Sequence, residues 1–127
     1  MFNHKLVLTA CGVAILMLVA AASGNAWGTF NRTTHLTFNR PVALPGVTLG
    51  AGTYIFELAD PGMNLDIVRV LSNDRRRVYL MAFTAPIERP KGRPDLLVSL
   101  GEAPPGAAPP ITAWYEMGEN RGHRFIY

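Results

Sequence analysis

The stretch GTYIFELADPG (residues 52–62) decides the fold class of this chain of 127 residues. Tyr54, Phe56 and Leu58 alternate with Ile55 and Glu57. This alternation predicts a β-strand that turns its aromatic face toward a core. Glycine stands at both ends of the stretch and proline at its C-terminal end, where turns need a positive φ or a fixed φ. The clearest local pattern in the chain therefore predicts a strand between two turns.

Short runs of the same kind recur along the chain, and prolines and glycines separate them. Residues 65–71 and 78–83 are apolar on both faces, which predicts strands in the middle of a sheet. Proline-rich residues 84–95 and 103–110 are predicted to be loops. Further strands are predicted at residues 35–38, 47–49, 96–100, 111–116 and 123–127. We therefore predict an all-β domain: a single β-sandwich, or a small barrel, of about seven short antiparallel strands.

The first 26 residues differ in kind from the rest of the chain. They contain Lys5, no acidic residue, and an uncharged apolar run over residues 6–22. This order is typical of a helical secretory signal peptide, and small side chains predict cleavage after Ala26 or after Ala22. Two alternatives stay open. The leader could remain as a membrane anchor, or Cys11 could be lipidated, because the residues before it resemble a bacterial lipobox.

The predicted organisation is a signal peptide at residues 1–26, a flexible lead-in at 27–32 and a β-sandwich domain at 33–127. We expect the mature protein in the periplasm or outside the cell. Cys11 is the single cysteine, so the mature chain cannot form a disulfide, a thiol nucleophile or a cysteine metal site. Residues 27–127 carry 11 basic and 9 acidic side chains, a net charge of 11 − 9 = +2. This charge does not indicate a nucleic-acid partner.

Motifs for catalysis are absent from the sequence. Two histidines follow the leader, His35 and His123, and both are predicted to face solvent. A zinc or catalytic role would require either one to meet an Asp or Glu in the folded chain. The sequence has no nucleophile elbow, no phosphate-binding loop and no dinucleotide fingerprint. We predict a non-enzymatic domain with no cofactor or metal; an enzyme with an unrecognised site is kept as an alternative.

Basic side chains are gathered in two predicted loops. Six cations would form one anion-binding patch if these loops met at one end of the domain. The partner would then be an anionic lipid or polysaccharide of the cell envelope. The alternative is that the charges only keep the domain soluble and its edges unpaired. The six residues are Arg75, Arg76, Arg77, Arg89, Lys91 and Arg93.

Aromatic side chains suggest a second function. Trp114 and Tyr115, together with Trp27, could stack on sugar rings if they were exposed on a concave face. A buried Trp114 would favour the basic loops as the site instead.

Two segments carry a resemblance to known proteins. The first is PGVTLGAGTYIF (residues 45–56); the second contains AWY (113–115), Gly118, Gly122 and FIY (125–127). Together they resemble a family of small exported bacterial proteins of unassigned function. The resemblance implies an all-β exported domain and no catalytic residues. The family pattern has proline where this chain has Gly50, which implies a more mobile turn. Gly118 and Gly122 are both predicted to lie in a hairpin turn.

Overall fold

The computed structural model describes residues 33–127, and all of their regular structure is β. The predicted signal peptide with its predicted cleavage sites, Cys11, the predicted lead-in and Trp27 lie outside the described residues. The all-β prediction is confirmed. The strands are β1 (Thr33–Phe38), β2 (Val42–Leu44), β3 (Val47–Leu49), β4 (Gly52–Asp60), β5 (Asn64–Ser72), β6 (Val78–Glu88), β7 (Val98–Leu100), β8 (Ile111–Tyr115) and β9 (Arg121–Phe125). Within this part of the chain, no helix is long and apolar enough to span a bilayer.

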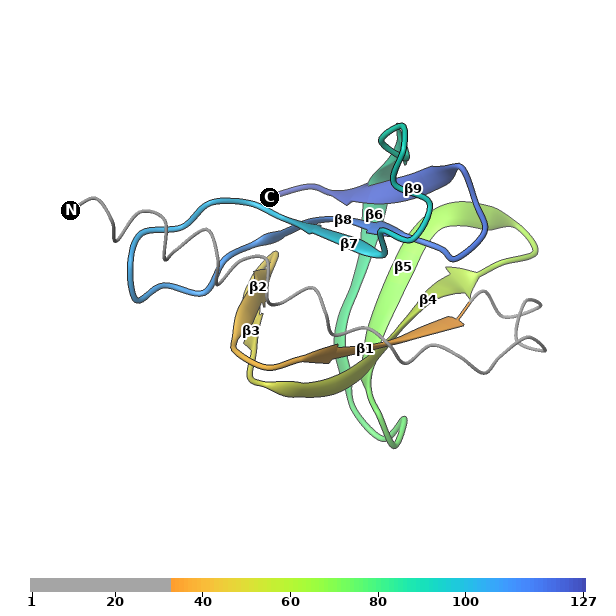
Figure 1. The fold of residues 1–127 in the computed structure, drawn as a ribbon. Coiled ribbons are helices and arrows are strands. Elements are labelled where there is room, and N and C mark those ends of the chain that lie inside the picture. Colours follow the sequence, from red (N-terminus) through yellow and green to blue (C-terminus); the bar gives the residue numbers. More distant parts are fainter. Residues whose placement is uncertain (1–32) are drawn as a thin grey trace.

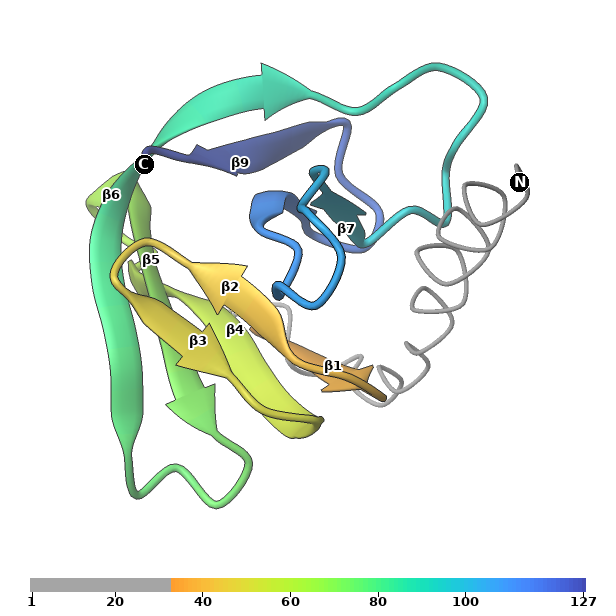
Figure 2. The ribbon, with the colours of Figure 1, turned by 90° about the vertical axis from the view of Figure 1, so that its left-hand side faces the viewer.

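Seven of the strands form one antiparallel sheet in the order β1-β4-β5-β6-β9-β8-β7, and β2 and β3 form a separate hairpin. The sheet curls into half a barrel, with the hairpin in front of its concave side (Figures 1 and 2). The sandwich or barrel expectation therefore holds only in its coarser form, a curled antiparallel all-β fold. The two strands with apolar residues on both faces, β5 and β6, do lie in the middle of the sheet.

The hydrophobic core lies against the concave face of the sheet. Alternate residues of β4 point into it, and Phe56 contacts both Trp114 and Phe125, with ring centroids 6.0 and 6.5 Å apart. Val68 and Val70 of β5 lie opposite Leu58 and Phe56 and are fully buried. Burial of each such side chain contributes about 1.5–3 kcal/mol. The core therefore links strands from both ends of the chain.

The β2–β3 hairpin is fastened to the C-terminal half of the chain. The backbone nitrogen of Ala43 donates to the carbonyl oxygen of Pro109 at 2.9 Å. The hydroxyl of Tyr127 donates to the carbonyl oxygens of Ile111 at 2.6 Å and Ala43 at 3.1 Å. Burial raises the pKa of the Tyr127 hydroxyl to about 12, so it stays a donor at physiological pH. These bonds hold the hairpin over the core.

β6 is longer than the sequence predicts, since residues 84–88 belong to the strand and not to the following loop. The strand changes partners along its length: residues up to Phe83 pair with β5, and the rest pair with β9. The backbone N–H of Arg89 donates to the carbonyl oxygen of Asn120, which precedes β9. Because the backbone nitrogens of successive residues in a strand point to opposite sides, the nitrogen of Pro86 points away from β9. On that side the pairing with β5 extends only to Phe83, so a proline at position 86 breaks no ladder bond there.

Candidate functional site

The two basic clusters lie at opposite ends of β6. Residues 75–77 form the turn before the strand, and Arg89, Lys91 and Arg93 follow its last residue. β6 has 11 residues, so at about 3.3 Å per residue the path along the strand between the clusters is about 33 Å long. Figure 1 shows the two loops on opposite sides of the fold. The structure therefore does not bring the six cations into one patch.

The β5–β6 turn has a fixed shape. Asp74 accepts hydrogen bonds from the Ser72 hydroxyl at 2.6 Å and from the backbone nitrogen of Arg76 at 3.0 Å. These two bonds, the first above all, lower the pKa of the Asp74 carboxyl. The nitrogen of Ser72 also donates to the carbonyl oxygen of Arg77 at 2.9 Å. A closed turn of this kind holds its exposed side chains in a defined direction.

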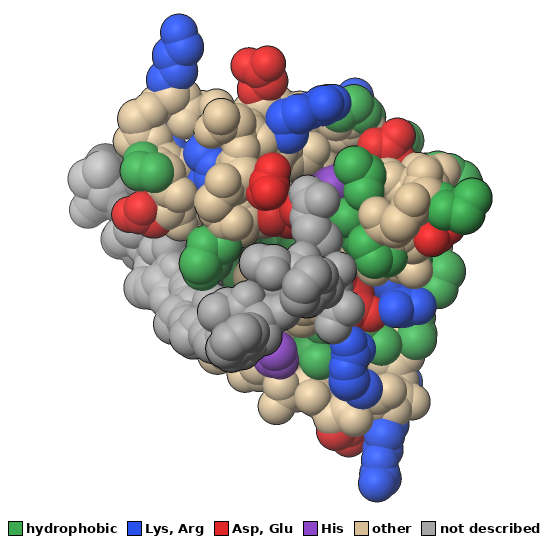
Figure 3. All heavy atoms as spheres, turned by 90° about the vertical axis from the view of Figure 1, so that its right-hand side faces the viewer, with side chains coloured by type: hydrophobic (Ala, Val, Ile, Leu, Met, Phe, Trp, Pro, Cys, Tyr) green, Lys and Arg blue, Asp and Glu red, His purple; other side chains and the backbone are tan. Residues whose placement is uncertain are grey.

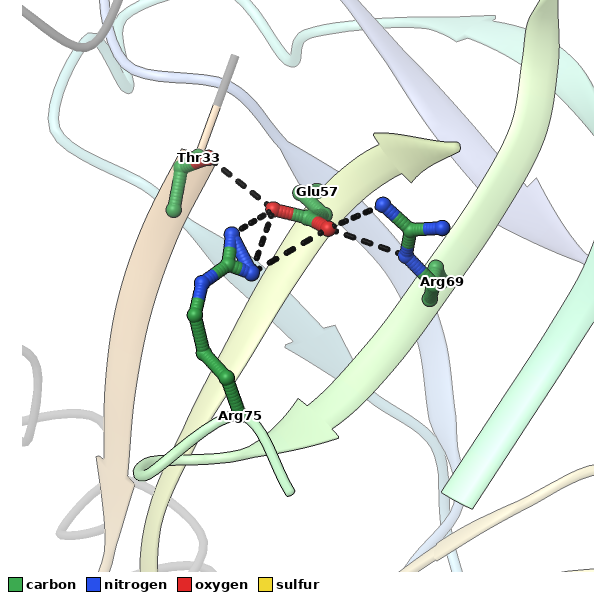
Figure 4. A network of polar contacts seen from close by, with 4 residues as sticks. All are labelled: Thr33, Glu57, Arg69 and Arg75. Carbon is green, nitrogen blue, oxygen red and sulfur yellow. Dashed lines mark hydrogen bonds and ion pairs between the residues drawn. The ribbon is translucent and has the colours of Figure 1, made fainter. Parts of the chain in front are cut away.

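Arg75 belongs to a structural ion-pair network and not to a free patch (Figure 4). Its guanidinium lies 2.6 Å from one carboxylate oxygen of Glu57, and that of Arg69 lies 2.6 Å from the other. The Thr33 hydroxyl donates to the same carboxylate at 3.2 Å. Glu57 is buried, so its charge needs these partners. Arg75 therefore compensates a buried charge of the sheet.

The backbone of Arg75 has a φ of 66°, a left-handed conformation that costs a non-glycine residue about 1 kcal/mol. We expect Arg75→Gly and Arg75→Ala both to lose the ion pair, but the glycine variant to be about 1 kcal/mol more stable than the alanine variant because it relieves the backbone strain. Urea denaturation of the two variants checks this. An alanine variant as stable as the glycine variant would show that the turn relaxes to another conformation.

The remaining cations of the turn are exposed. The guanidinium of Arg77 lies over the ring of Tyr79, 5.1 Å from its centroid, and Tyr79 packs edge-on against Tyr54. The Arg76 side chain is exposed. Of the three arginines predicted to bind anions here, Arg75 is the one paired with Glu57, whereas Arg76 and Arg77 are exposed.

Arg89 has a structural role at the other end of β6. It donates to four carbonyl oxygens, among them those of Leu96 at 2.5 Å and Glu116 at 2.8 Å, and lies 5.4 Å from the centre of the Tyr115 ring. It thereby joins the loop after β6 to the end of β8. Lys91 and Arg93 are exposed on that loop.

The residues predicted to stack on sugars are both buried. Trp114 has no exposed surface and Tyr115 is 2% exposed. Neither ring offers a face to a ligand, so the prediction of sugar stacking by these two residues is wrong. The reason is the strand alternation, which directs Trp114 to the concave side, while Tyr115, on the other face, is covered by Arg89.

His123 is buried, in contrast to the prediction that it faces solvent. Its Nε2 lies 2.6 Å from a carboxylate oxygen of Glu116, and its ring stacks on Trp114 with centroids 5.0 Å apart. The sequence did not signal this pair, because it forms across the β8–β9 turn. His35 is half-buried and lies opposite Ile55. Across residues 33–127 there is no group of three or more His, Asp or Glu side chains arranged to hold a metal ion.

The convex face of β5 and β6 carries an exposed apolar surface that follows the basic turn. The register pairs Ile67 with Phe83 and Leu71 with Val78, so these residues share the face opposite to the core. Phe83 is 63% and Met81 54% exposed. In Figure 3, hydrophobic side chains reach the surface along the right-hand side of the view, with basic side chains beside and below them. We call Leu65, Ile67, Val78, Met81 and Phe83 the convex patch.

Comparisons with known proteins found no matching family model, no matching curated protein and no matching solved structure. The resemblance to small exported bacterial proteins therefore stays a prediction.

Proposed function

We propose that this protein is an exported, non-enzymatic binding module of the cell envelope, and that it binds an anionic ligand at the β5–β6 turn. The observation that carries the proposal is the exposure of Arg76 and Arg77 on a turn whose shape Asp74 and Ser72 fix. The leader supports export, because its charge and apolar run have the order of a secretory signal.

The chemistry of the turn favours phosphate or carboxylate groups. A guanidinium group presents several N–H donors in one plane and forms short, charge-assisted bonds with such anions. The nearby carboxylate of Glu57 does not compete, since two guanidinium groups already compensate it. Asp74 is engaged by the turn itself. Binding of this kind should weaken as salt concentration rises.

We expect the double substitution Arg76→Ser and Arg77→Ser to weaken binding to vesicles that contain phosphatidylglycerol by about 30-fold, because each basic residue near an anionic membrane contributes about 1 kcal/mol. Exported protein is mixed with vesicles of phosphatidylcholine with and without phosphatidylglycerol, and the bound fraction is measured by sedimentation. Arg75 is left in place because it compensates Glu57.

The matched control is Lys91→Ser with Arg93→Ser, which removes the same charge at the opposite end of β6. This variant should keep most of the parent's preference for anionic vesicles. Equal losses in the two double variants would mean that net charge, and not the turn, determines binding. No preference for anionic vesicles in the parent would contradict the proposal.

A further inference from the structure

The convex patch is unusual for its place in the sheet. Its residues lie on the two middle strands, and four of the five are exposed: Leu65, Val78, Met81 and Phe83. An antiparallel sheet with one face on a core commonly has polar residues on the other face. A contiguous exposed apolar surface marks a place where another molecule docks.

The charges around the convex patch indicate what that molecule is. Arg76 and Arg77 precede Val78 at one end. At the other end Arg124 pairs with Ala85, two residues beyond Phe83, and is exposed. Within the patch, Arg69 lies opposite Met81 and is paired with Glu57. The patch is thus an apolar surface between basic groups, which is complementary to an anionic amphiphile.

A second copy of the chain fits this surface poorly. In a two-fold contact the same patch lies on both subunits. Basic residues at both ends of the patch would then face basic residues in either orientation, and like charges at an interface are unfavourable.

We propose that the convex patch inserts into the interfacial region of an anionic lipid bilayer, with Phe83 and Met81 among the acyl chains and Arg76 and Arg124 at the phosphates. The inference rests on the proposed function and deepens it, since it identifies the anionic ligand as a membrane surface and not a soluble polyanion. Interfacial binding of this kind combines buried apolar area with attraction to anionic headgroups. Here Phe83 and Met81 supply the apolar area and the arginines supply the attraction to headgroups, so substitutions can remove each contribution separately.

The test places a polarity-sensitive fluorophore on the patch. Phe83→Cys is made in a Cys11→Ser background, so that the exported chain has one thiol, and is labelled with a nitrobenzoxadiazole dye. The control is Ala107→Cys in the same background, because Ala107 is exposed on the loop between β7 and β8. Each labelled protein is mixed with phosphatidylglycerol vesicles, with phosphatidylcholine vesicles, and with soluble glycerophosphoglycerol.

We expect the emission at position 83 to shift to the blue with phosphatidylglycerol vesicles, and that at position 107 to stay unchanged. Equal shifts at both positions would overturn the proposal, as would a shift at 83 that appears with protein concentration in the absence of lipid. No shift at 83, with the sedimentation preference for anionic vesicles intact, would overturn insertion and leave the proposed function standing. Absence of the emission shift at position 83 together with absence of the sedimentation preference would overturn insertion and the proposed function alike.

A pair of variants tests the same proposal without a label. Met81→Ser with Phe83→Ser should weaken binding to phosphatidylglycerol vesicles by about tenfold, because less apolar surface leaves water. Both side chains are exposed, so the fold should persist, and the circular dichroism spectrum checks this. The double serine variant should still prefer anionic over neutral vesicles, whereas the Arg76 and Arg77 variant should lose that preference. Unchanged binding of the serine variant would overturn insertion.

Discussion

We expect Trp114→Ala to destabilise the domain by about 3–5 kcal/mol, the cost of removing a fully buried aromatic side chain. Trp114 is completely buried, stacks on His123 and contacts Phe56. Small domains have a total stability of about 5–15 kcal/mol, so this one change would remove a large part of it. A fall in the melting temperature of about 15 °C or more, followed by circular dichroism, checks the expectation.

Trp114→Phe is the matched control. Within the described chain, the Nε1 atom of Trp114 is buried without a hydrogen-bond partner. Phenylalanine keeps part of the ring volume and removes this unsatisfied donor, so we expect a loss of about 1–2 kcal/mol. A melting temperature that stays within a few degrees of the parent in Trp114→Ala would mean that this side chain does not fill the core.

We expect Gly122→Ala to cost about 2–3 kcal/mol, because the added methyl group overpacks the sheet. A Cβ atom at this position would lie 2.4 Å from Cδ1 of Tyr115 and 2.8 Å from the carbonyl oxygen of Trp114. Tyr115 cannot move away easily, since it is buried and Arg89 lies against its ring. Urea denaturation measures the free energy of unfolding of the variant.

Gly50→Ala is the control for this prediction. No atom comes within 4 Å of a Cβ at Gly50, and its φ is ordinary, so we expect a change within about 0.5 kcal/mol. In a Tyr115→Ala background the clash with the Tyr115 ring disappears, and Gly122→Ala should lose most of its extra cost. An equal cost with and without Tyr115 would show that the clash with the Trp114 carbonyl oxygen dominates.

Gly118 and Gly122 illustrate how far the sequence can be interpreted. The sequence predicted a hairpin turn for both. Gly118 lies between β8 and β9 and has a φ of 82°, so this part of the prediction is confirmed. Gly122 lies inside β9, where a tyrosine ring of the neighbouring strand occupies the place of its side chain. Local sequence identifies a glycine whose backbone adopts a positive φ, as at Gly118. It does not identify a glycine that leaves room for a ring of another strand, as at Gly122.

The strands themselves were mostly predictable. The alternation of Tyr54, Phe56 and Leu58 and the apolar runs at 65–71 and 78–83 correspond to β4, β5 and β6. These patterns follow from the two-residue period of a strand, which is local. The end of β6 was missed because Pro86 is tolerated only where the pairing with β5 has stopped, and sheet topology decides where that is.

For the basic residues too, the local sequence predicted one part and the tertiary structure decided the other. The sequence identified Arg75, Arg76 and Arg77 as a cluster, but Arg75 compensates Glu57, and Glu57 comes from another strand. The second cluster lies at the other end of β6, so the two loops do not meet. The apolar character of both faces of β6 was visible in the sequence, but the exposure of its convex face was not.

The sequence by itself therefore determined the fold class, the position of most strands and the two basic loops, because periodicity and turn residues act over a few neighbouring positions. Only the tertiary structure decided which arginines are engaged, that Trp114 and His123 are buried, and which face of β5 and β6 meets solvent. Each of these depends on contacts between strands far apart in the chain, and the curl of the sheet sets those contacts.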